Sequence, residues 1–155
     1  MELQKILHNA EKSCAGSGTR FTEKRKRVLT CLLAFDKAVS AYDIVAAMQA
    51  QYDDKIPPMS VYRILEFLET QNLVHKLSSN SKYVACSHIA CEHSHEIPQF
   101  LICDKCDKVK EIKVQKDIIA SLYGSVKKAG YALKSHRLEL HCLCDSCNNL
   151  QQKST

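Results

Sequence analysis

Two pairs of cysteines, each pair separated by two residues, carry the strongest chemical signal in this sequence. Cys103 and Cys106 lie in FLICDKCDKVKEI, and Cys144 and Cys147 lie in ELHCLCDSCNNL. Two thiolates at this spacing can converge on one ion, and two such pairs complete a tetrahedral site with four sulfur ligands. Zinc suits this ligand set because it has no redox chemistry, although iron can occupy the same geometry. We therefore predict a structural zinc site at these four cysteines.

Other uses of paired cysteines fit the sequence less well. The polar start of the chain lacks the apolar core of a signal peptide, and no run approaches the length of a membrane span. We therefore expect a cytoplasmic protein, and in that reducing compartment the nine cysteines are not expected to form a disulfide framework. A thioredoxin-like redox couple would need a single pair that opens a helix in a βαβ unit.

A zinc-dependent enzyme is also disfavoured. The deaminase signature H-x-E followed by P-C-x-x-C is not matched by HSHEIPQFLICDKC, where the glutamate directly follows His95 and Pro98 does not precede Cys103. A site filled by four thiolates leaves no coordination position for a catalytic water. We predict no catalytic residues.

The composition allows a nucleic-acid partner without establishing one. The 155 residues are 45% apolar and 25% charged, as in an ordinary soluble globular protein. The formal charge of +5 favours anionic partners but is too small to demonstrate nucleic-acid binding.

The first half of the chain has the element order of a winged helix-turn-helix. Apolar residues at helical spacing predict four helices, with Thr22 capping the second, Ser40 capping the third, and the fourth at about 59–71. Two strand-like runs follow at 73–77 and 82–86, joined by a turn-rich segment. We predict a DNA-binding domain over residues 1–86.

The second half predicts a small α/β domain. Residues 87–99 are irregular and rich in histidine, as expected of a linker. Strands are then predicted at 100–103 and 108–114, a helix at about 115–129 and a strand at 132–140. Because so few large apolar residues are present, a metal ion and a dimer interface should both stabilise this part. The fold class is therefore α+β, with a dimerisation and metal-binding domain over 100–155.

The fourth predicted helix carries residues suited to reading DNA. If its apolar stripe is buried, three positions near its amino end stay exposed: Ser60, Tyr62 and Arg63. Arg63 can make a bidentate contact to guanine, and Tyr62 can reach a phosphate or a thymine methyl group. The alternative is an ordinary solvated helix face. The basic run at 24–27 has the same two interpretations, a solvated face or a clamp for phosphates.

Five stretches together resemble the ferric uptake regulator superfamily over nearly the whole chain. They are PPMSVYRILEFLETQNLVHKL, RFTEKRKRVL, SAYDIVAAM, LICDKCDKVKEI and HRLELHCLCDSC, and they are most similar to the zinc-sensing branch, the zinc uptake regulators. The resemblance implies a dimeric, metal-dependent repressor that binds double-stranded operator DNA. It also implies that Arg25, at the family's matching arginine position, contacts DNA. One departure is Asp107, where the family usually has glycine.

The resemblance further implies a regulatory metal site. Its four ligands would be His75, Cys86, His95 and Glu111. A thiolate combined with imidazoles and a carboxylate suits Zn²⁺ better than Fe²⁺, which more often has only nitrogen and oxygen ligands. Three residues of the same segment remain rival or additional ligands: His88, Cys91 and His93. We expect two zinc ions per subunit, and a third site stays open.

These observations lead to one functional hypothesis and two alternatives. The hypothesis is a cytoplasmic, homodimeric repressor of zinc-uptake genes, in which zinc favours operator binding. An iron- or peroxide-sensing regulator of the same superfamily is the first alternative. A zinc-stapled protein-interaction module is the second, but it would leave Tyr62, Arg63 and the predicted wing without a purpose. No membrane partner is expected.

Overall fold

The chain folds into two compact units, Met1–His93 and Ser94–Thr155. The computed structural model describes residues 2–89 and 97–153. Both units mix helices with short strands, which confirms the predicted α+β class. Among the described residues, no helix is long and apolar enough to cross a membrane.

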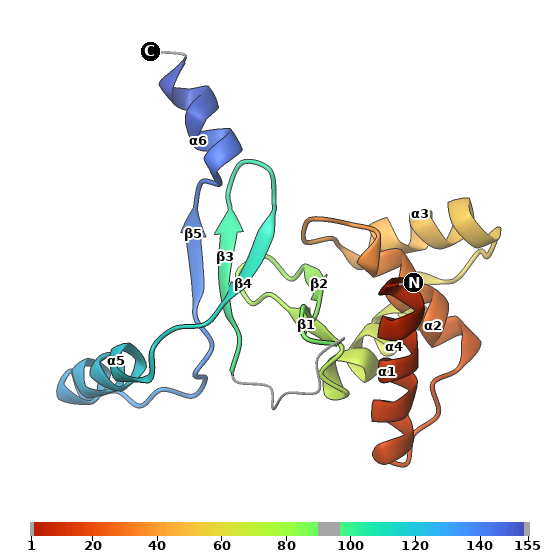
Figure 1. Cartoon of the computed structure of the whole chain (residues 1–155), viewed down its shortest axis with the longest axis horizontal. Coiled ribbons are helices and arrows are strands. Elements are labelled where there is room, and N and C mark those ends of the chain that lie inside the picture. Colours follow the sequence, from red (N-terminus) through yellow and green to blue (C-terminus); the bar gives the residue numbers. More distant parts are fainter. Residues whose placement is uncertain (1, 90–96, 154–155) are drawn as a thin grey trace. The chain divides into compact units, whose positions relative to one another are not determined.

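The first unit is a helix-turn-helix domain with a two-stranded wing (Figure 1). Its elements are α1 (Glu2–Gly16), α2 (Glu23–Leu33), α3 (Ala41–Tyr52), α4 (Pro58–Thr70), β1 (Val74–Lys76) and β2 (Tyr83–Ala85). The two strands pair antiparallel, with His75 opposite Val84. The order of these elements is the predicted one.

Side-chain caps begin the second and third helices where the sequence predicted them. The Thr22 hydroxyl accepts a hydrogen bond from the backbone N–H of Arg25. At α3 the Ser40 hydroxyl accepts from the Asp43 N–H (3.2 Å), and the Asp43 carboxylate accepts from the Ser40 N–H (2.8 Å). This reciprocal pair is a capping box. The backbone N–H of Ser40, followed by its hydroxyl, lowers the pKa of Asp43 because both donate to the charged carboxylate.

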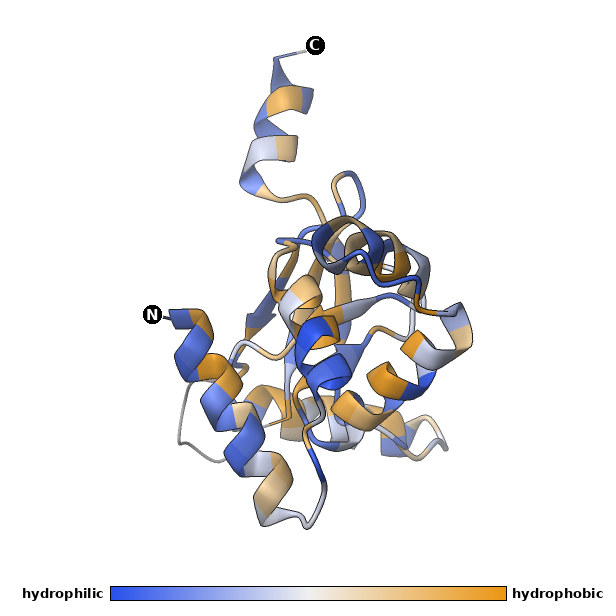
Figure 2. Ribbon diagram, turned by 90° about the vertical axis from the view of Figure 1, so that its right-hand side faces the viewer, coloured by the Kyte–Doolittle hydropathy of each residue, from blue (hydrophilic) through white to orange (hydrophobic). Residues whose placement is uncertain are grey.

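The apolar stripe of α4 fixes the orientation of this helix. Val61, Leu65 and Leu68 are fully buried in one core cluster with residues of α2 and α3. Figure 2 shows how hydrophobic residues alternate with hydrophilic ones around the helices. Because one face of α4 is buried, the opposite face must point to solvent.

The second unit is a three-stranded sheet with two helices. Its elements are β3 (Gln99–Cys103), β4 (Val109–Ile112), α5 (Lys116–Lys128), β5 (Glu139–Cys142) and α6 (Asp145–Gln152). The strand order is β4-β3-β5, with β3 antiparallel to β4 and parallel to β5. The central strand carries the buried side chains Phe100 and Ile102.

One predicted strand is mostly wrong. The strand expected at 132–140 is observed only as β5, from Glu139 to Cys142. Before β5 the Gln99 side chain, which is 4% exposed, adds two hydrogen bonds to the backbone bond from the Phe100 N–H to the Leu138 carbonyl (2.9 Å). Its Nε2 donates to the carbonyl of His136 (2.9 Å), and its Oε1 accepts from the N–H of Leu138 (2.5 Å). The Gln99 side chain therefore holds the residues just before β5 against β3.

Helix α6 was not predicted from the sequence. It is short and polar, and within it only Cys147 is buried. A helix without an apolar stripe gives no periodic signal. Its start matters for the site because Cys144 occupies the N-cap position.

The hydrogen bonds of the Gln99 side chain should stabilise the second unit. Replacing Gln99 by Ala should leave the N–H of Leu138 and the carbonyl of His136 without their partner, and should lower the free energy of unfolding by about 1–3 kcal/mol. The measurement is urea unfolding followed by circular dichroism. The control is Gln115→Ala, at an exposed residue whose side chain caps nothing. Equal stability of the two variants would contradict the assigned role of Gln99.

Candidate metal centre and nucleic-acid-binding surface

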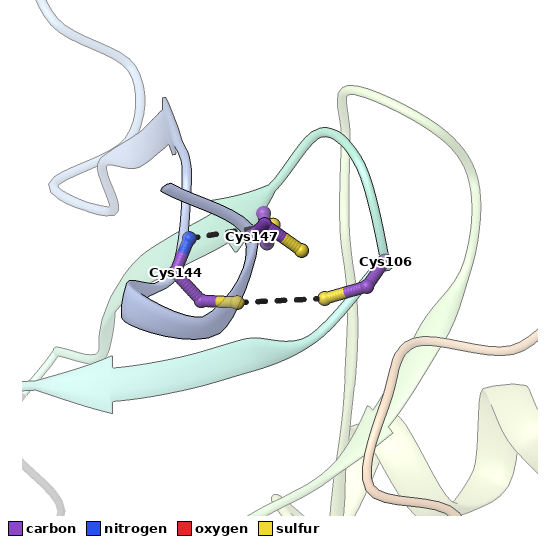
Figure 3. A group of neighbouring side chains, drawn as sticks. Cys106, Cys144 and Cys147 are labelled. Atoms are coloured by element: carbon purple, nitrogen blue, oxygen red, sulfur yellow. Dashed lines mark hydrogen bonds between the residues drawn. The ribbon is translucent and has the colours of Figure 1, made fainter. Parts of the chain in front are cut away.

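Two turns bring the four paired cysteines together in the second unit. Cys103 ends β3 and Cys106 lies in the turn after it, while Cys144 caps α6 and Cys147 lies in its first turn. Parallel pairing of β3 with β5 places residue 142 opposite Cys103, which carries the start of α6 to the first cysteine pair. All four sulfur atoms lie within 4.8 Å of one another. Figure 3 shows the sulfur atoms of Cys106 and Cys144 pointing toward each other.

The spacing of these sulfur atoms fits one tetrahedral ion. Zinc–sulfur bonds of about 2.3 Å in a tetrahedron separate the sulfur atoms by roughly 3.8 Å. The sulfur atoms of Cys106 and Cys144 are 3.7 Å apart. Cys103 and Cys147 are buried, and the other two are half-buried, so the cluster is shielded from water without being sealed. Four convergent thiols of this kind suit zinc.

The pKa of one of these thiols is lowered and the pKa values of two others are raised. The backbone N–H of Cys144, 3.4 Å from the Cys103 sulfur, and those of Cys106 and Lys105 lower the pKa of Cys103 to about 6. The neighbouring Cys144 side chain, followed by burial, raises the pKa of Cys147 to about 12. The backbone N–H of Lys108 lowers the pKa of Cys106, but burial and the neighbouring thiols outweigh it, and the pKa is raised. A divalent cation bound here would displace the protons of Cys106 and Cys147, because thiolates are the ligands.

The turn that carries the first cysteine pair accommodates Asp107 at the position where glycine would be usual. Asp107 has a φ of 59°, in the left-handed region that glycine populates most readily. Aspartate is one of the few other residues that adopt this conformation routinely. The Asp107 N–H donates to the carbonyl of Cys103 (3.0 Å). The turn therefore closes with aspartate in place of glycine.

The remaining cysteines have different surroundings. Cys14 and Cys31 are fully buried in the core of the first unit, and burial raises the pKa of both thiols. Cys142 is half-buried, and its sulfur lies near the carbonyls of Ile102 and Leu140. Cys91 is outside the described residues. Cys86 belongs to a group of candidate metal ligands that includes His75.

The wing brings His75 and Cys86 together. His75 is on β1 and Cys86 directly follows β2, where its N–H donates to the carbonyl of Leu73 (2.9 Å). A ligand atom of His75 and the sulfur of Cys86 lie within 4.8 Å of each other. The Cys86 sulfur also accepts a hydrogen bond from the N–H of His88 (3.4 Å). An imidazole and a thiol are thus adjacent on the wing itself.

The other proposed regulatory ligands belong to the second unit, lie elsewhere in the first, or fall outside the described residues. Glu111 lies on β4 of the second unit, opposite Phe100, and is half-buried. His88 is described, and its Nδ1 lies 3.2 Å from the Ser87 hydroxyl. His95, His93 and Cys91 fall outside the described residues, as does most of the predicted linker. The joining of these residues into one site stays a prediction.

The solvent face of α4 presents the residues that the sequence singled out for DNA. Tyr62 is 37% exposed, Arg63 is exposed and Ser60 is half-buried. Met59 in the first turn of α4 and Tyr42 in the first turn of α3 are each 64% exposed, and the sequence did not single them out. Their exposure depends on how each helix packs, which periodicity alone does not show. The amino end of α4 therefore offers both polar and apolar groups.

The basic run on α2 is tied to α4. The guanidinium carbon of Arg25 lies 3.4 Å from the centre of the Phe67 ring on α4, and Arg25 also donates to the carbonyl of Arg20. Arg27 pairs with Glu23 at 3.5 Å. A guanidinium carries several N–H donors, so Arg25 can brace α4 and still offer a donor to a phosphate.

The fold and the site together define a class of protein. A winged helix-turn-helix with an exposed, partly basic helix, followed by an α/β unit with four convergent thiols, defines a winged-helix DNA-binding protein with a metal centre. The sequence profile of the Ferric uptake regulator family matches residues 16–150, and the chain belongs to this family.

Individual relatives agree with this assignment. The chain is 38% identical over 146 residues to the zinc uptake regulation protein of Escherichia coli strain K12, covering 93% of this chain and 82% of that protein. It is 27% identical to the ferric uptake regulation protein of Campylobacter jejuni, over 99% of this chain and 95% of that protein. A zinc uptake regulator solved in complex with zinc and DNA is 32% identical, with a TM-score of 0.81 over 98% of this chain and 99% of that chain.

Each of the four clustered cysteines should be needed to retain one tightly bound zinc ion. Cys144→Ser should lose one tightly bound zinc ion and unfold the second unit or dissociate the dimer, because structural zinc contributes to the folding free energy. Zinc per chain after dialysis against a chelator, circular dichroism and sedimentation measure these effects. Cys142→Ser is the matched control on the same segment and should behave as wild type. A folded Cys144→Ser dimer with unchanged zinc would refute the site.

Proposed function

We propose that this chain is a zinc-responsive, DNA-binding transcriptional repressor of zinc-uptake genes, acting in the cytoplasm as a homodimer. The thiol–imidazole pair of Cys86 and His75 carries this proposal, because it puts soft metal ligands on the DNA-binding unit itself. The similarity to a zinc uptake regulator that binds zinc and DNA supports it.

One zinc ion would be structural. Its ligands would be Cys103, Cys106, Cys144 and Cys147, whose sulfur atoms already converge. Bound zinc would neutralise the thiolates and join the end of β3 to the start of α6. Since four sulfur ligands fill a tetrahedral ion, no water is activated there and no enzymatic reaction is proposed.

A second zinc ion would be regulatory. Its proposed ligands are His75 and Cys86 from the wing, His95 from the linker at 87–99, and Glu111 from β4. Zinc held by both units would favour one arrangement of the two DNA-reading helices in the dimer. If that arrangement binds the operator better, zinc and DNA assist each other by about 1–3 kcal/mol, or roughly 5–150-fold in affinity. His88, Cys91 and His93 are candidates for a third site.

Two observations favour zinc over iron. A thiolate ligand at Cys86 suits zinc, whereas iron sensors more often use nitrogen and oxygen ligands. Identity to the zinc uptake regulation protein of E. coli also exceeds identity to the ferric uptake regulation protein of C. jejuni. An iron- or peroxide-sensing regulator of the same family is the alternative function.

DNA reading is assigned to α4 and the adjoining α2. In helix-turn-helix proteins the recognition helix enters the major groove by its amino end, where Ser60, Tyr62 and Arg63 lie. Arg63 would contact guanine, with Ser60 and Tyr62 beside it, and Arg25 would hold a phosphate from α2.

Dimerisation is assigned to residues 100–155. None of the residues 116–128 of α5 is buried, although the helix is amphipathic. Ile118 is 56% exposed and Leu140 on the edge strand β5 is 46% exposed. Apolar surface of this kind on a small unit is typical of an interface that a second subunit covers. A dimer would present two α4 helices to the half-sites of a palindrome.

The direct test of this function is operator binding against free metal. A palindromic duplex selected from random DNA in the presence of zinc would be labelled and titrated with protein at buffered concentrations of Zn²⁺. A parallel series would use Fe²⁺ without oxygen. Affinity that rises with zinc at far lower free concentrations than with iron supports the proposal, and the reverse order would establish the iron-sensing alternative.

Arg63 should determine specificity at one base pair in each half-site. Arg63→Ala should weaken operator binding by about 1–3 kcal/mol and reduce discrimination at that position, because a bidentate contact to guanine is lost. Arg63→Lys is the matched control, since it keeps the charge without the planar fork and should keep binding to random DNA. If Arg63→Ala weakened operator and random DNA equally, its role would be backbone contact.

Cys86 should be required for the zinc response but not for folding. Cys86→Ser should keep the four-cysteine zinc and the dimer while losing zinc-dependent operator binding, because a soft ligand is removed. Glu111→Ala should act in the same direction more mildly, His95→Ala should resemble Cys86→Ser, and His93→Ala should have little effect. Operator affinity against buffered zinc, with bound zinc counted in parallel, measures all four. A Cys86→Ser protein with the wild-type zinc response would remove the regulatory assignment.

A further inference from the structure

We infer that Asn9 of α1 is a positioning residue for Cys86, the proposed regulatory zinc ligand. The side-chain Nδ2 of Asn9 donates to the carbonyl of Ile89 at 3.2 Å, across 80 residues of sequence. This inference rests on the regulatory role proposed above for Cys86. It further proposes that helix α1 of the first unit holds this ligand in place.

The segment that Asn9 holds begins with Cys86. At its first residue, the N–H of Cys86 donates to the carbonyl of Leu73 (2.9 Å). Within it, the N–H of His88 donates to the sulfur of Cys86 (3.4 Å). At its last described residue, the carbonyl of Ile89 accepts from Asn9. The turn that carries the thiol is therefore held at both ends.

The direction of the Asn9 contact is unambiguous. A carbonyl can only accept, so Asn9 must present its amide nitrogen to Ile89. The contact is partly buried, and the Ile89 side chain is only 7% exposed in the core cluster that contains Ala10 and Cys14 of α1. Asn9 thus adds a directed bond to an apolar contact between α1 and the turn.

The residue that directly follows α1 makes a second long-range bond, to the C-cap of α4. At the carboxyl end of α1, the hydroxyl of Ser17 donates to Oε1 of Gln71 at 2.5 Å, and Gln71 is the C-cap of α4. α1 therefore contacts the ligand-bearing turn through Asn9 and the end of α4 through Ser17. The two contacts can be removed separately.

Holding the turn before metal arrives should strengthen zinc binding. A ligand that is already ordered loses less conformational freedom when it binds, and groups that orient a ligand without touching the metal commonly change metal affinity. Loss of one hydrogen bond of ordinary strength corresponds to about a threefold to tenfold change in an equilibrium constant.

The test uses Asn9→Asp, which keeps the size of the side chain but replaces the N–H donor by an oxygen facing the Ile89 carbonyl. The full-length protein, with its four-cysteine site filled by zinc, is first freed of the second metal. The rate of Cys86 alkylation is then measured by peptide mass spectrometry, and the affinity for the second zinc ion by competition with a chelator. Alkylation about threefold to tenfold faster and zinc binding weaker by a similar factor are expected.

Ser17→Ala is the matched control. It removes a long-range bond made by the residue directly after the same helix, but one that reaches the C-cap of α4 and not the Cys86 turn. It should lower the unfolding midpoint while leaving Cys86 alkylation and zinc affinity at wild-type values. A merely structural role of α1 would make the two variants alike.

Two results would overturn the inference. One is an Asn9→Asp protein with wild-type alkylation and wild-type zinc affinity, and the other is a Ser17→Ala protein that changes both as much as Asn9→Asp does. The Cys86→Ser variant distinguishes a failure of the role of Asn9 from a failure of the proposed regulatory site. If it loses the second zinc while Asn9→Asp is unchanged, only the role of Asn9 fails. If Cys86→Ser keeps that zinc, the proposed regulatory site itself fails.

Discussion

Four sulfur atoms within 4.8 Å of one another can all be ionised only around a cation, and the second unit is built on this constraint. The unit has a small core centred on β3, and its other helices and strands are largely half-buried or exposed. A divalent ion at the four cysteines would fasten the turn after β3 to the amino end of α6. Structural zinc contributes to the folding free energy of small domains in this way. If the second unit dimerises as proposed, its stability and the pairing of the two α4 helices would then depend on that ion.

The first unit presents a fixed helix face and also carries candidate metal ligands. Burial of Val61, Leu65 and Leu68 orients α4, and the stacking of Arg25 on Phe67 braces it against α2. The wing that follows α4 carries His75 and ends at Cys86. The proposed DNA-reading helix therefore ends only a few residues before His75, the first of the proposed regulatory ligands. A metal ion that ordered the end of the wing would therefore act within the same unit that carries α4.

Much of this arrangement could be predicted from the sequence. The caps at Thr22 and Ser40, the buried stripe of α4 and the hairpin all follow from local patterns that the structure reproduces. The paired cysteines identified the four-sulfur cluster because their spacing has few other uses. The irregular segment before β5 could not be predicted, since it is held by hydrogen bonds from the buried Gln99 side chain to the backbone of His136 and Leu138. Helix α6 has no apolar stripe, and the bond from Asn9 to Ile89 joins residues that no local pattern connects.

Zinc and operator DNA are proposed to favour the same state of the protein, and the reciprocity of binding allows this coupling to be measured from the zinc side. The affinity of the second zinc ion would be measured by chelator competition without DNA and with saturating operator duplex, with a scrambled duplex as the control. If zinc tightens operator binding by some factor, the operator must tighten zinc binding by the same factor, expected to be about 5–150-fold. A zinc affinity that saturating operator leaves unchanged would contradict the account.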